Sequence, residues 1–268
     1  MGFDKQQPIA ALKSGCNLHF FDTVASTNQT LWDLLKQGEK PGSVVIATRQ
    51  TAGRGQWGRQ WISSDGGLYL SMASSCRLEA SNSYQLTLAS AWGIAKKLQQ
   101  SGIPVGIKWP NDLVLNGRKL GGILTETKVN KGQITQAVIG VGINWANPVP
   151  ETGINLLFWQ AFSNSQAINS LEMLAYVVLQ GIQSGLECLL NEGITTLLSG
   201  YVDLLANMGE KVYVSNQVGT VIGVTPNGLL RVSTETKHIK TKNSSDAEVT
   251  EICLQPGTIS LGYSKFSD

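Results

Sequence analysis

Short apolar runs separated by glycine-rich turns fill the chain between Ser43 and Asn144, and this pattern constrains the fold most. The runs are Val44–Thr48, Gly67–Ser74, Val105–Trp109, Asp112–Asn116, Leu120–Lys128 and Ile134–Trp145. The segments Asn116-Gly117 and Asn130-Lys131-Gly132 stand between consecutive runs, where such turns favour tight antiparallel hairpins. A purely parallel sheet is therefore disfavoured. The pattern predicts an α+β fold built on a mixed, largely antiparallel sheet.

Two stretches have the periodicity of amphipathic helices. The first, Tyr84–Gln100, follows Ser83, a good N-cap residue, and ends before Gly102. The second, Ser170–Asn191, repeats apolar residues at spacings of three and four. A further helix is expected to run through Leu205. We expect these helices to flank the sheet.

The texture of the chain changes after Gly209. Short β-branched runs follow at Lys211–Ser215, Thr220–Val224 and Leu229–Ser233, with Pro226-Asn227-Gly228 as a turn. A length of 268 residues suits a main domain with a small appendage. The sequence therefore predicts a main domain over residues 1–207 and a small β-barrel-like domain over residues 208–268. An exposed loop is expected at Asn243–Asp246.

Composition and charge narrow the class of protein. Hydrophobic residues make up 42% and charged residues 15%, with a net charge of +2, which is typical of a globular protein and does not indicate nucleic acid as a partner. The four cysteines form no CxxC pair, and the N-terminal residues carry no apolar signal core. Apolar runs such as Leu174–Leu179 are too short to span a bilayer, and Gln6 stands where the myristoylation motif needs Ser or Thr. We expect a cytoplasmic protein without membrane attachment.

The segment Gly53-Arg54-Gly55-Gln56-Trp57-Gly58 matches the GxGxxG pattern of dinucleotide-binding turns. That turn must open a helix, whereas residues 59–67 have no helical periodicity and end in a diglycine. A dinucleotide fold is therefore disfavoured. Arginine interleaved with glycine suits a loop that covers phosphate or carboxylate groups, because glycine lets backbone N–H groups approach an anion and guanidinium groups supply forked donors. A surface turn rich in Gly and Arg is the alternative.

Four motifs together resemble the biotin protein ligases in order and spacing. They are GRGQWGRQW at Gly53–Trp61, KWPND at Lys108–Asp112, RKLGGIL at Arg118–Leu124 and GVGIN at Gly140–Asn144. Ser26-Thr27-Asn28 and Gln50 are similar to the biotin-pocket segments of that family. The resemblance runs from about Phe20 to the end of the chain. It implies a core like that of class II aminoacyl-tRNA synthetases and biotin ligases, with flanking helices, followed by a small SH3-like β-barrel.

The resemblance implies a ligase reaction in two steps, of which the first consumes ATP. Biotin's carboxylate attacks the α-phosphorus of ATP to give biotinyl-5′-AMP, and a specific lysine of the biotin carboxyl carrier protein of acetyl-CoA carboxylase then attacks this mixed anhydride. Two anions meet in the first step, so cations and Mg²⁺ are needed to offset their repulsion. A lipoate protein ligase shares this adenylation logic and is the alternative enzyme, although GRGQWGR together with KWPND fits biotin better.

The resemblance also assigns the charged roles. Lys119 bridges the carboxylate of biotin and the α-phosphate, a task that suits a compact ammonium. From the local sequence alone, a solvated turn lysine would be the favoured interpretation of Lys119, and the RKLGGIL match reverses this preference. Arg54 and Arg59 are assigned to the triphosphate and the carboxylate. Asp112 either orients the incoming lysine amine or helps to hold Mg²⁺; the sequence leaves both roles open and identifies no set of metal ligands.

Neutral donors and acceptors suit the uncharged ureido ring of biotin. The residues expected to contact biotin are Ser26, Thr27, Asn28, Gln50, Gly53, Gly55, Trp61 and Gly122, and those expected to contact ATP are Lys108, Asn111, Asn144 and Gln56. Simpler roles compete for some of these residues. Ser-Thr-Asn could cap a helix over Gln29–Leu35, Trp61 could be a packing residue and Asn144 a turn former. His19 and His238 match no catalytic position.

Two features depart from the best-known members of the family. Gln56 stands where the pattern GRGRxGR has arginine, and a neutral amide cannot hold the adenylate by charge, so we hypothesise that ordering of the loop is weaker here or uses other residues. Members that also repress transcription carry a helical DNA-binding domain ahead of the segment that begins here near Phe20, whereas fewer than twenty residues precede it. We therefore expect no repressor activity and no nucleic-acid partner. An exposed sheet edge could form a homodimer, and no residue pattern decides this.

Overall fold

The computed structural model describes residues 17–214, 217–236, 248–259 and 261–263. The main sheet contains β1 (Leu18–Val24), β2 (Val44–Gln50), β3 (Leu68–Ser74), β4 (Leu78–Glu79), β5 (Gly106–Lys108), β6 (Asp112–Leu115), β7 (Arg118–Asn130) and β8 (Gln133–Ile143). Its strand order is β1-β2-β3-β8-β7-β6-β5, and β4 pairs with β8. The β1–β2 pair is parallel, and the other pairs described are antiparallel. The predicted α+β class with a mixed, largely antiparallel sheet is confirmed.

The predicted hairpins form at both Gly-containing turns. Leu115 pairs with Arg118 across Asn116 and Gly117, whose φ angles are 49° and 70°. The β7–β8 hairpin turns in the same way through Lys131 and Gly132, with φ angles of 50° and 77°. Two central residues with positive φ give a type I′ turn, whose twist matches that of the flanking strands. These turns set the register that later places charged side chains next to one another.

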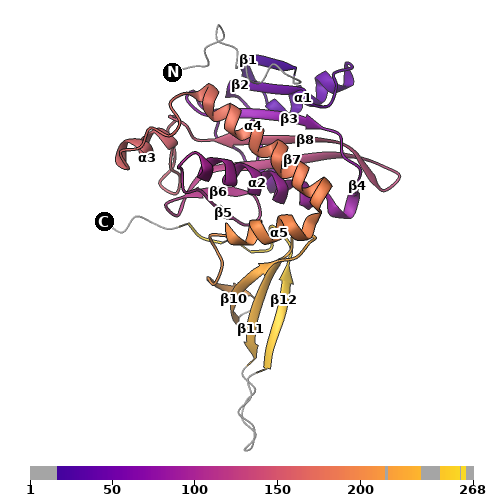
Figure 1. Ribbon diagram of the computed structural model, residues 1–268, viewed down its shortest axis with the longest axis vertical. Helices are drawn as coiled ribbons and strands as arrows, with labels where there is room; N and C mark the ends of the chain where they lie inside the picture. Colours follow the sequence, from indigo (N-terminus) through magenta and orange to yellow (C-terminus); the bar gives the residue numbers. More distant parts are fainter. Residues whose placement is uncertain (1–16, 215–216, 237–247, 260, 264–268) are drawn as a thin grey trace, which may run out of the picture.

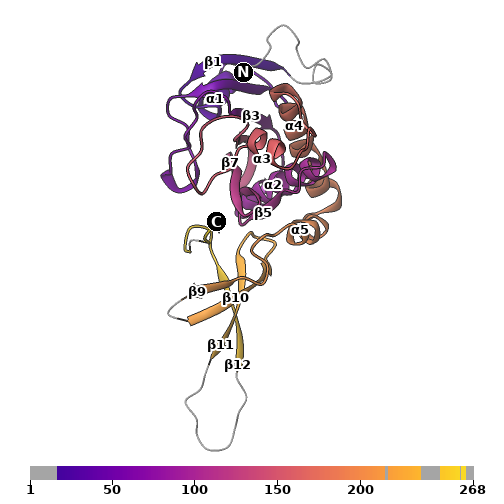
Figure 2. The same ribbon diagram turned by 90° about the vertical axis from the view of Figure 1, so that its left-hand side faces the viewer.

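Helices cover both faces of the main sheet (Figures 1 and 2). They are α1 (Thr27–Lys36), α2 (Ser83–Gln100), α3 (Leu156–Phe162), α4 (Leu171–Glu187) and α5 (Ile194–Asp203). On one face, Leu31 and Leu35 of α1 pack with Val45 and Val138 in a small apolar cluster. On the other face, α2 and α4 pack over the sheet in the large core, which also takes in α5. The sheet is therefore the middle layer, with its strand ends and loops left for a site.

Helices α2 and α4 cross so closely that only glycine fits between them. A Cβ atom on Gly93 would lie 2.1 Å from the carbonyl oxygen of Gly181, and one on Gly185 would lie 2.0 Å from that of Ala89. Ser170 caps α4 by accepting a hydrogen bond from the backbone N–H of Met173. A π-helical turn, Cys188–Glu192, extends α4. The segment Leu171–Glu192 is long and apolar enough to cross a membrane, but 61% of its most apolar window is buried, as in a core helix.

Several elements differ from the sequence-based expectation. The N-cap of α2 is Asn82, because the helix begins at Ser83 itself, so the prediction of Ser83 as N-cap was wrong by one residue. Strand β1, the two-residue β4 and helix α3 carried no pattern that we recognised. β1 is an edge strand whose neighbour is parallel, and α3 is too short to show a helical period. The expected loop Asn243–Asp246 lies outside the described residues.

A second, four-stranded antiparallel sheet lies at one end of the molecule, below α5 in Figure 1. It contains β9 (Lys211–Val214), β10 (Gln217–Val224), β11 (Leu230–Thr236) and β12 (Glu248–Leu254) in the order β12-β11-β10-β9. This sheet is consistent with the expected SH3-like domain. The indole N–H of Trp109 donates to the carbonyl of Gly228 over 2.9 Å, so the KWPND segment is held by a turn of the second sheet. The boundary at residues 207 and 208 stays a prediction.

The helix crossing gives a test of the packing. We expect Gly93→Val to lower the free energy of unfolding by about 2–4 kcal/mol, because its side chain must push α2 away from α4. Gln100→Ala, on the exposed end of the same helix, should change it by less than about 0.5 kcal/mol. Urea denaturation followed by circular dichroism measures both. Equal stability of Gly93→Val and the unmodified chain would contradict the close crossing.

Candidate active site

A cavity of about 300 Å³ opens at the strand ends of the main sheet. It is bounded by the glycine loop (residues 53–61), the start of α1, the β5–β6 hairpin, β7, β8 and, from the C-terminal segment, Gly257, Ile259 and residues 261–263. The predicted residues that line it are Ser26, Thr27, Asn28, Gln50, Arg54, Gly55, Gln56, Arg59, Trp61, Lys108, Asn111, Asp112, Lys119 and Gly122. Segments far apart in the sequence thus meet at one cavity, and the ligand contacts assigned to their residues stay predictions.

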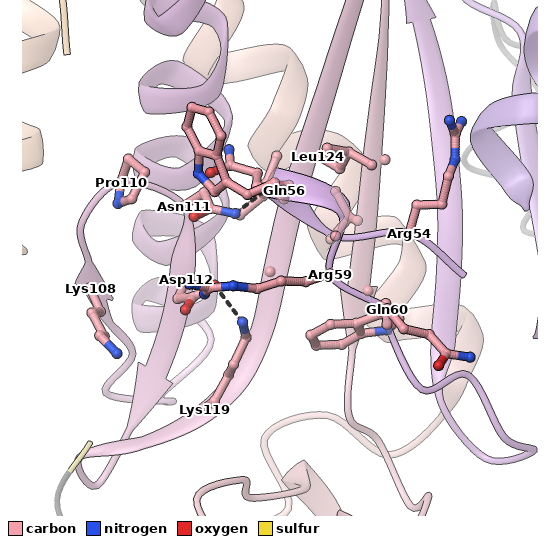
Figure 3. A pocket seen from close by; sticks show the side chains of 18 of the residues that line it. Arg54, Gln56, Arg59, Gln60, Lys108, Pro110, Asn111, Asp112, Lys119 and Leu124 are labelled. Carbon is pink, nitrogen blue, oxygen red and sulfur yellow. Dashed lines mark hydrogen bonds and ion pairs between the residues drawn. The ribbon is translucent and has the colours of Figure 1, made fainter. Parts of the chain in front are cut away.

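An ion pair lies at the centre of the cavity. The Nζ atom of Lys119 on β7 is 2.7 Å from Oδ1 of Asp112 on β6, and these side chains are 28% and 15% exposed. A bulge between these strands lets Leu113 pair with Gly121 while Val114 pairs with Lys119. A Cβ atom on Gly122 would lie 3.3 Å from Oδ1 of Asp112, so glycine leaves room at this carboxylate. Figure 3 shows Arg59 and Lys119 directed toward Asp112.

A second lysine lies beside this pair. Lys108 is only 8% exposed, and burial lowers its pKa to about 8; the charge of Asp112 opposes this shift, whereas those of Lys119 and Arg59 add to it. Its ammonium lies 3.2 Å from the centre of the Tyr263 ring, a cation–π contact. The Tyr263 hydroxyl donates to Oδ2 of Asp112, and burial raises the pKa of this tyrosine, so it stays a donor. Sequence reasoning missed Tyr263, because a single tyrosine near the end of a chain carries no motif.

A neutral hydrogen-bonded pocket adjoins the charged cluster. Ser26 is the N-cap of α1, but its side chain makes no capping hydrogen bond and faces the cavity. Oε1 of Gln50 accepts a hydrogen bond from the backbone N–H of Thr27 at 2.8 Å, and Nε2 of Gln50 donates to the Ser63 hydroxyl at 2.8 Å. The predicted polar groups are therefore fixed in orientation. Ser63, which orients Gln50, was not anticipated from the sequence.

Arg54 has a partner that the sequence analysis did not identify. Its Nη2 atom lies 3.1 Å from the carboxylate of Glu126 on β7. The same carboxylate accepts a hydrogen bond of 2.9 Å from Nδ2 of Asn28. Figure 3 shows Arg54 extending away from Asp112 and Lys119, unlike Arg59. The two arginines of the glycine loop therefore have different environments.

Two predicted residues do not line the cavity. Gly53 is buried behind the loop, where a Cβ atom would lie 2.4 Å from the carbonyl oxygen of Trp61, so glycine is needed for close packing of the loop base. Asn144 is 7% exposed and donates to the carbonyl of Lys119 at 3.3 Å. Its side-chain oxygen accepts from Asn147 at 3.0 Å. Asn144 thus supports the backbone of Lys119, and its assigned contact with ATP stays a prediction.

The glycine loop folds as a tight hairpin over the cavity. Arg54 and Gln60 form an isolated antiparallel β-bridge, and the backbone N–H of Gly55 donates to the carbonyl of Arg59 at 2.7 Å. Trp57 at the tip has φ of 59°, a left-handed conformation that is uncommon for tryptophan. Its ring lies against Gly257, where a Cβ atom would be 2.9 Å from the ring. The tip of the loop thus contacts the C-terminal segment.

Trp61 at the base of the loop is both a packing residue and part of the cavity wall. A Cβ atom on Gly142 would lie 2.4 Å from its Nε1 atom, and the Nζ atom of Lys119 is 5.3 Å from its ring. Its buried indole N–H has no hydrogen-bond partner within the described part of the chain. Both interpretations of Trp61 are therefore compatible with its position. His19 lies outside the cavity lining, 3.3 Å from Glu39, and His238 is outside the described residues.

The described residues offer no group of metal-binding side chains around this site. Among the residues that the structure describes, no three His, Cys, Asp or Glu side chains lie close enough to hold a metal ion. Asp112 is the acidic residue that lines the cavity, and both of its oxygens have partners, Lys119 and Tyr263. The residues present therefore do not fit a resident metal.

Comparison with known proteins agrees with this site. The profile of the Biotin/lipoate A/B protein ligase family matches residues 20–144. The chain is 36% identical over 132 residues to the bifunctional ligase/repressor BirA of Bacillus subtilis, covering 48% of this chain and 41% of that protein. It is 35% identical over 216 residues to the BirA of Escherichia coli, covering 76% of this chain and 66% of that protein. The chain thus spans less than two thirds of the length of these relatives.

Solved structures share the fold. The biotin protein ligase from Aquifex aeolicus in complex with biotin and ATP superimposes with a TM-score of 0.65 at 24% identity, covering 88% of this chain and 95% of that one. The family profile ends at Asn144, so it spans the glycine loop, KWPND, RKLGGIL and GVGIN motifs that form the cavity. The profile and the relatives show that residues 20–144 form a domain of the biotin/lipoate A/B protein ligase family.

Proposed function

We propose that this chain is a biotin protein ligase that activates biotin with ATP to biotinyl-5′-AMP and transfers the biotinyl group to a lysine of biotin carboxyl carrier protein. The observation that carries the proposal is the Lys119–Asp112 ion pair at 2.7 Å, placed between a neutral polar pocket and two further cations. A neutral pocket suits a ureido ring, and cations suit a carboxylate and a phosphate that must meet. The similarity in fold to a biotin protein ligase solved with biotin and ATP favours biotin over lipoate.

The cationic side chains would control charge in the first step. Lys119 lies where an ammonium can contact a ligand carboxylate from the neutral pocket and an α-phosphate together, and Arg59 is directed to the same place (Figure 3). Lys108 borders the cavity on the side of the C-terminal segment, where it suits the triphosphate. These fixed charges would stabilise the charge that develops on the phosphoryl oxygens without reorganisation of solvent.

Asp112 would orient cations rather than hold a metal ion. Because Lys119 and Tyr263 engage its two oxygens, it can direct the Lys119 ammonium and then the amine of an incoming lysine. Mg²⁺ commonly binds through one or two carboxylates together with substrate phosphates. We infer that any Mg²⁺ would be held mainly by the phosphates of ATP, and no step here depends on it.

The remaining partners and the location stay predictions. The three described cysteines are free, which fits the reducing cytoplasm that we propose as its location.

The first test is the reaction itself. We expect incubation with ATP, Mg²⁺, biotin and a carrier domain to add one biotinyl group to one carrier lysine, measured by mass spectrometry, with lipoate run in parallel. Lys119→Ala should lower the rate by at least about 100-fold, because the central cation is lost. Lys40→Ala, which removes an exposed lysine outside the cavity, should leave it unchanged. Transfer of lipoate alone, or full activity in Lys119→Ala, would overturn the proposal.

The lowered pKa of Lys108 predicts a pH dependence. A lysine loses its charge as pH rises through its pKa, so with a pKa of about 8 only about a tenth of these side chains stay charged at about pH 9. We expect the KM for ATP to rise by up to about 10-fold between about pH 7 and pH 9. Lys108→Arg should flatten this rise, because guanidinium stays charged. An equally steep rise in that variant would exclude Lys108 as its source.

Gln56 lines the cavity at the tip of the loop, and its neutral side chain leads to a prediction about the retention of biotinyl-5′-AMP. Restoring a charge with Gln56→Arg should slow the release of biotinyl-5′-AMP into solution by about 3- to 10-fold, because a charge-assisted hydrogen bond to phosphate is stronger than a neutral one. Release is measured by chromatography of the free adenylate in the absence of carrier. Gln56→Ala is the matched control and should retain it no better than the unmodified chain. No change in retention or leakage for Gln56→Arg would refute the hypothesis.

A further inference from the structure

We propose that Glu126 is a positioning residue that anchors the base of the glycine loop by holding Arg54. The inference rests on the proposed function for its effect on ligand binding, but the anchor itself is a property of the free protein. Glu126 belongs to none of the recognised motifs and does not line the cavity. It lies on β7, two residues after Leu124, the last residue of RKLGGIL.

The direction of the Arg54 side chain supports this role. Arg54 and Arg59 lie on the two sides of the loop hairpin, yet Arg59 is directed toward Asp112 and Arg54 extends away from it (Figure 3). The Nη2 atom of Arg54 is 3.1 Å from the Glu126 carboxylate. Arg54 therefore connects the loop to the central strand β7, whereas Arg59 is left to act on a ligand.

The carboxylate of Glu126 has a second partner, Asn28. Its carboxylate also accepts a hydrogen bond of 2.9 Å from Nδ2 of Asn28 in the first turn of α1. Asn28 is itself fixed, because its Oδ1 accepts from the Ser71 hydroxyl at 2.6 Å and its Nδ2 also reaches the carbonyl of Leu124 at 3.3 Å. A Cβ atom on Gly140 would lie 2.2 Å from Oδ1 of Asn28, so β8 also leaves room for this arrangement.

One carboxylate thus joins three elements: the glycine loop through Arg54, the start of α1 through Asn28, and β7 itself. Two partners define the position of the carboxylate more closely than one, so Arg54 meets an acceptor that is already oriented. The start of α1 supplies the neutral pocket, and the loop supplies its cover. Glu126 therefore couples the wall that is proposed to hold biotin to the loop that is proposed to close over the adenylate.

Exposure indicates what the anchor stabilises. The side chain of Arg54 is 43% exposed and that of Glu126 is 27% exposed, so the pair is half-open to solvent. Such pairs contribute little to global stability, but they can decide which of two arrangements a short loop adopts. Removing the charge of Glu126 should therefore loosen the loop while the fold persists. The entropy cost of ordering the loop then weakens ligand binding, because each ligand must order the loop as it binds.

Glu126→Gln tests this inference, because glutamine keeps an oxygen for Asn28 and loses the charge that holds Arg54. We expect trypsin to cleave the ligand-free variant after Arg54 or Arg59 at least about 5-fold faster than it cleaves the unmodified chain. Both proteins contain these two cleavage sites, so a difference in rate reports the mobility of the loop. The KM for biotin in pyrophosphate release should rise about 5- to 10-fold with kcat within about 2-fold, the signature of lost binding rather than lost chemistry. Glu251→Gln, which breaks the Arg231–Glu251 pair of the second sheet, should change neither.

A double-mutant cycle separates an anchor from a direct contact. If Arg54 acts through Glu126, Arg54→Gln and the double variant Arg54→Gln/Glu126→Gln should raise the KM for biotin equally, because the second change removes nothing further. Independent, multiplying effects would overturn the inference, as would loop cleavage of Glu126→Gln at the rate of the unmodified chain. If neither the unmodified chain nor any variant releases pyrophosphate from ATP in the presence of biotin, the proposed function fails. The proteolysis result still decides whether Glu126 anchors the loop.

Discussion

The ion pair between Lys119 and Asp112 depends on the backbone of one hairpin, and the rest of the site is arranged around it. The two residues come from neighbouring strands, and a type I′ turn and a bulge set which side chains stand opposite one another. Two partly buried charges are costly unless each is paired and hydrogen-bonded. Lys119 pairs with Asp112, and the other oxygen of Asp112 accepts from Tyr263. A site that must gather anions therefore holds its cations in a compensated arrangement before any ligand binds.

The glycines of the motifs belong to the same arrangement. Gly122 leaves space at Asp112, Gly142 receives the indole of Trp61, and Gly140 receives Asn28. These glycines contact side chains of the protein. The RKLGGIL and GVGIN motifs are therefore needed for close packing around the site as much as for contact with a ligand. A Cβ atom at Gly140 or Gly142 would displace Asn28 or Trp61, both of which line the cavity. Packing and ligand recognition therefore cannot be separated at these positions.

The sequence predicted local elements well, and it failed to identify side-chain pairs between distant segments. Alternating apolar runs and Gly turns located the central strands and the hairpins, because these signals are local. The motif pattern also brought together the residues that line the cavity, apart from Gly53 and Asn144. Glu126 and Tyr263 were missed for one physical reason. Each acts through a partner from another element, Arg54 for one and Asp112 for the other, and such pairing depends on tertiary structure that a single sequence does not display.

The C-terminal segment changes how the division into two domains should be understood. Tyr263 engages Asp112 and Lys108, and Gly257 receives the ring of Trp57, so the cavity is walled by both predicted domains. Gln56 removes a charge from the tip of the glycine loop, yet the adjacent Trp57 gives that tip an apolar contact with the C-terminal segment. An apolar contact is insensitive to the charge of the ligand and to salt, whereas an arginine contact depends on both. The geometry therefore favours the second form of the Gln56 hypothesis, in which ordering of the loop uses other residues, because Trp57 already joins the tip of the loop to the C-terminal segment.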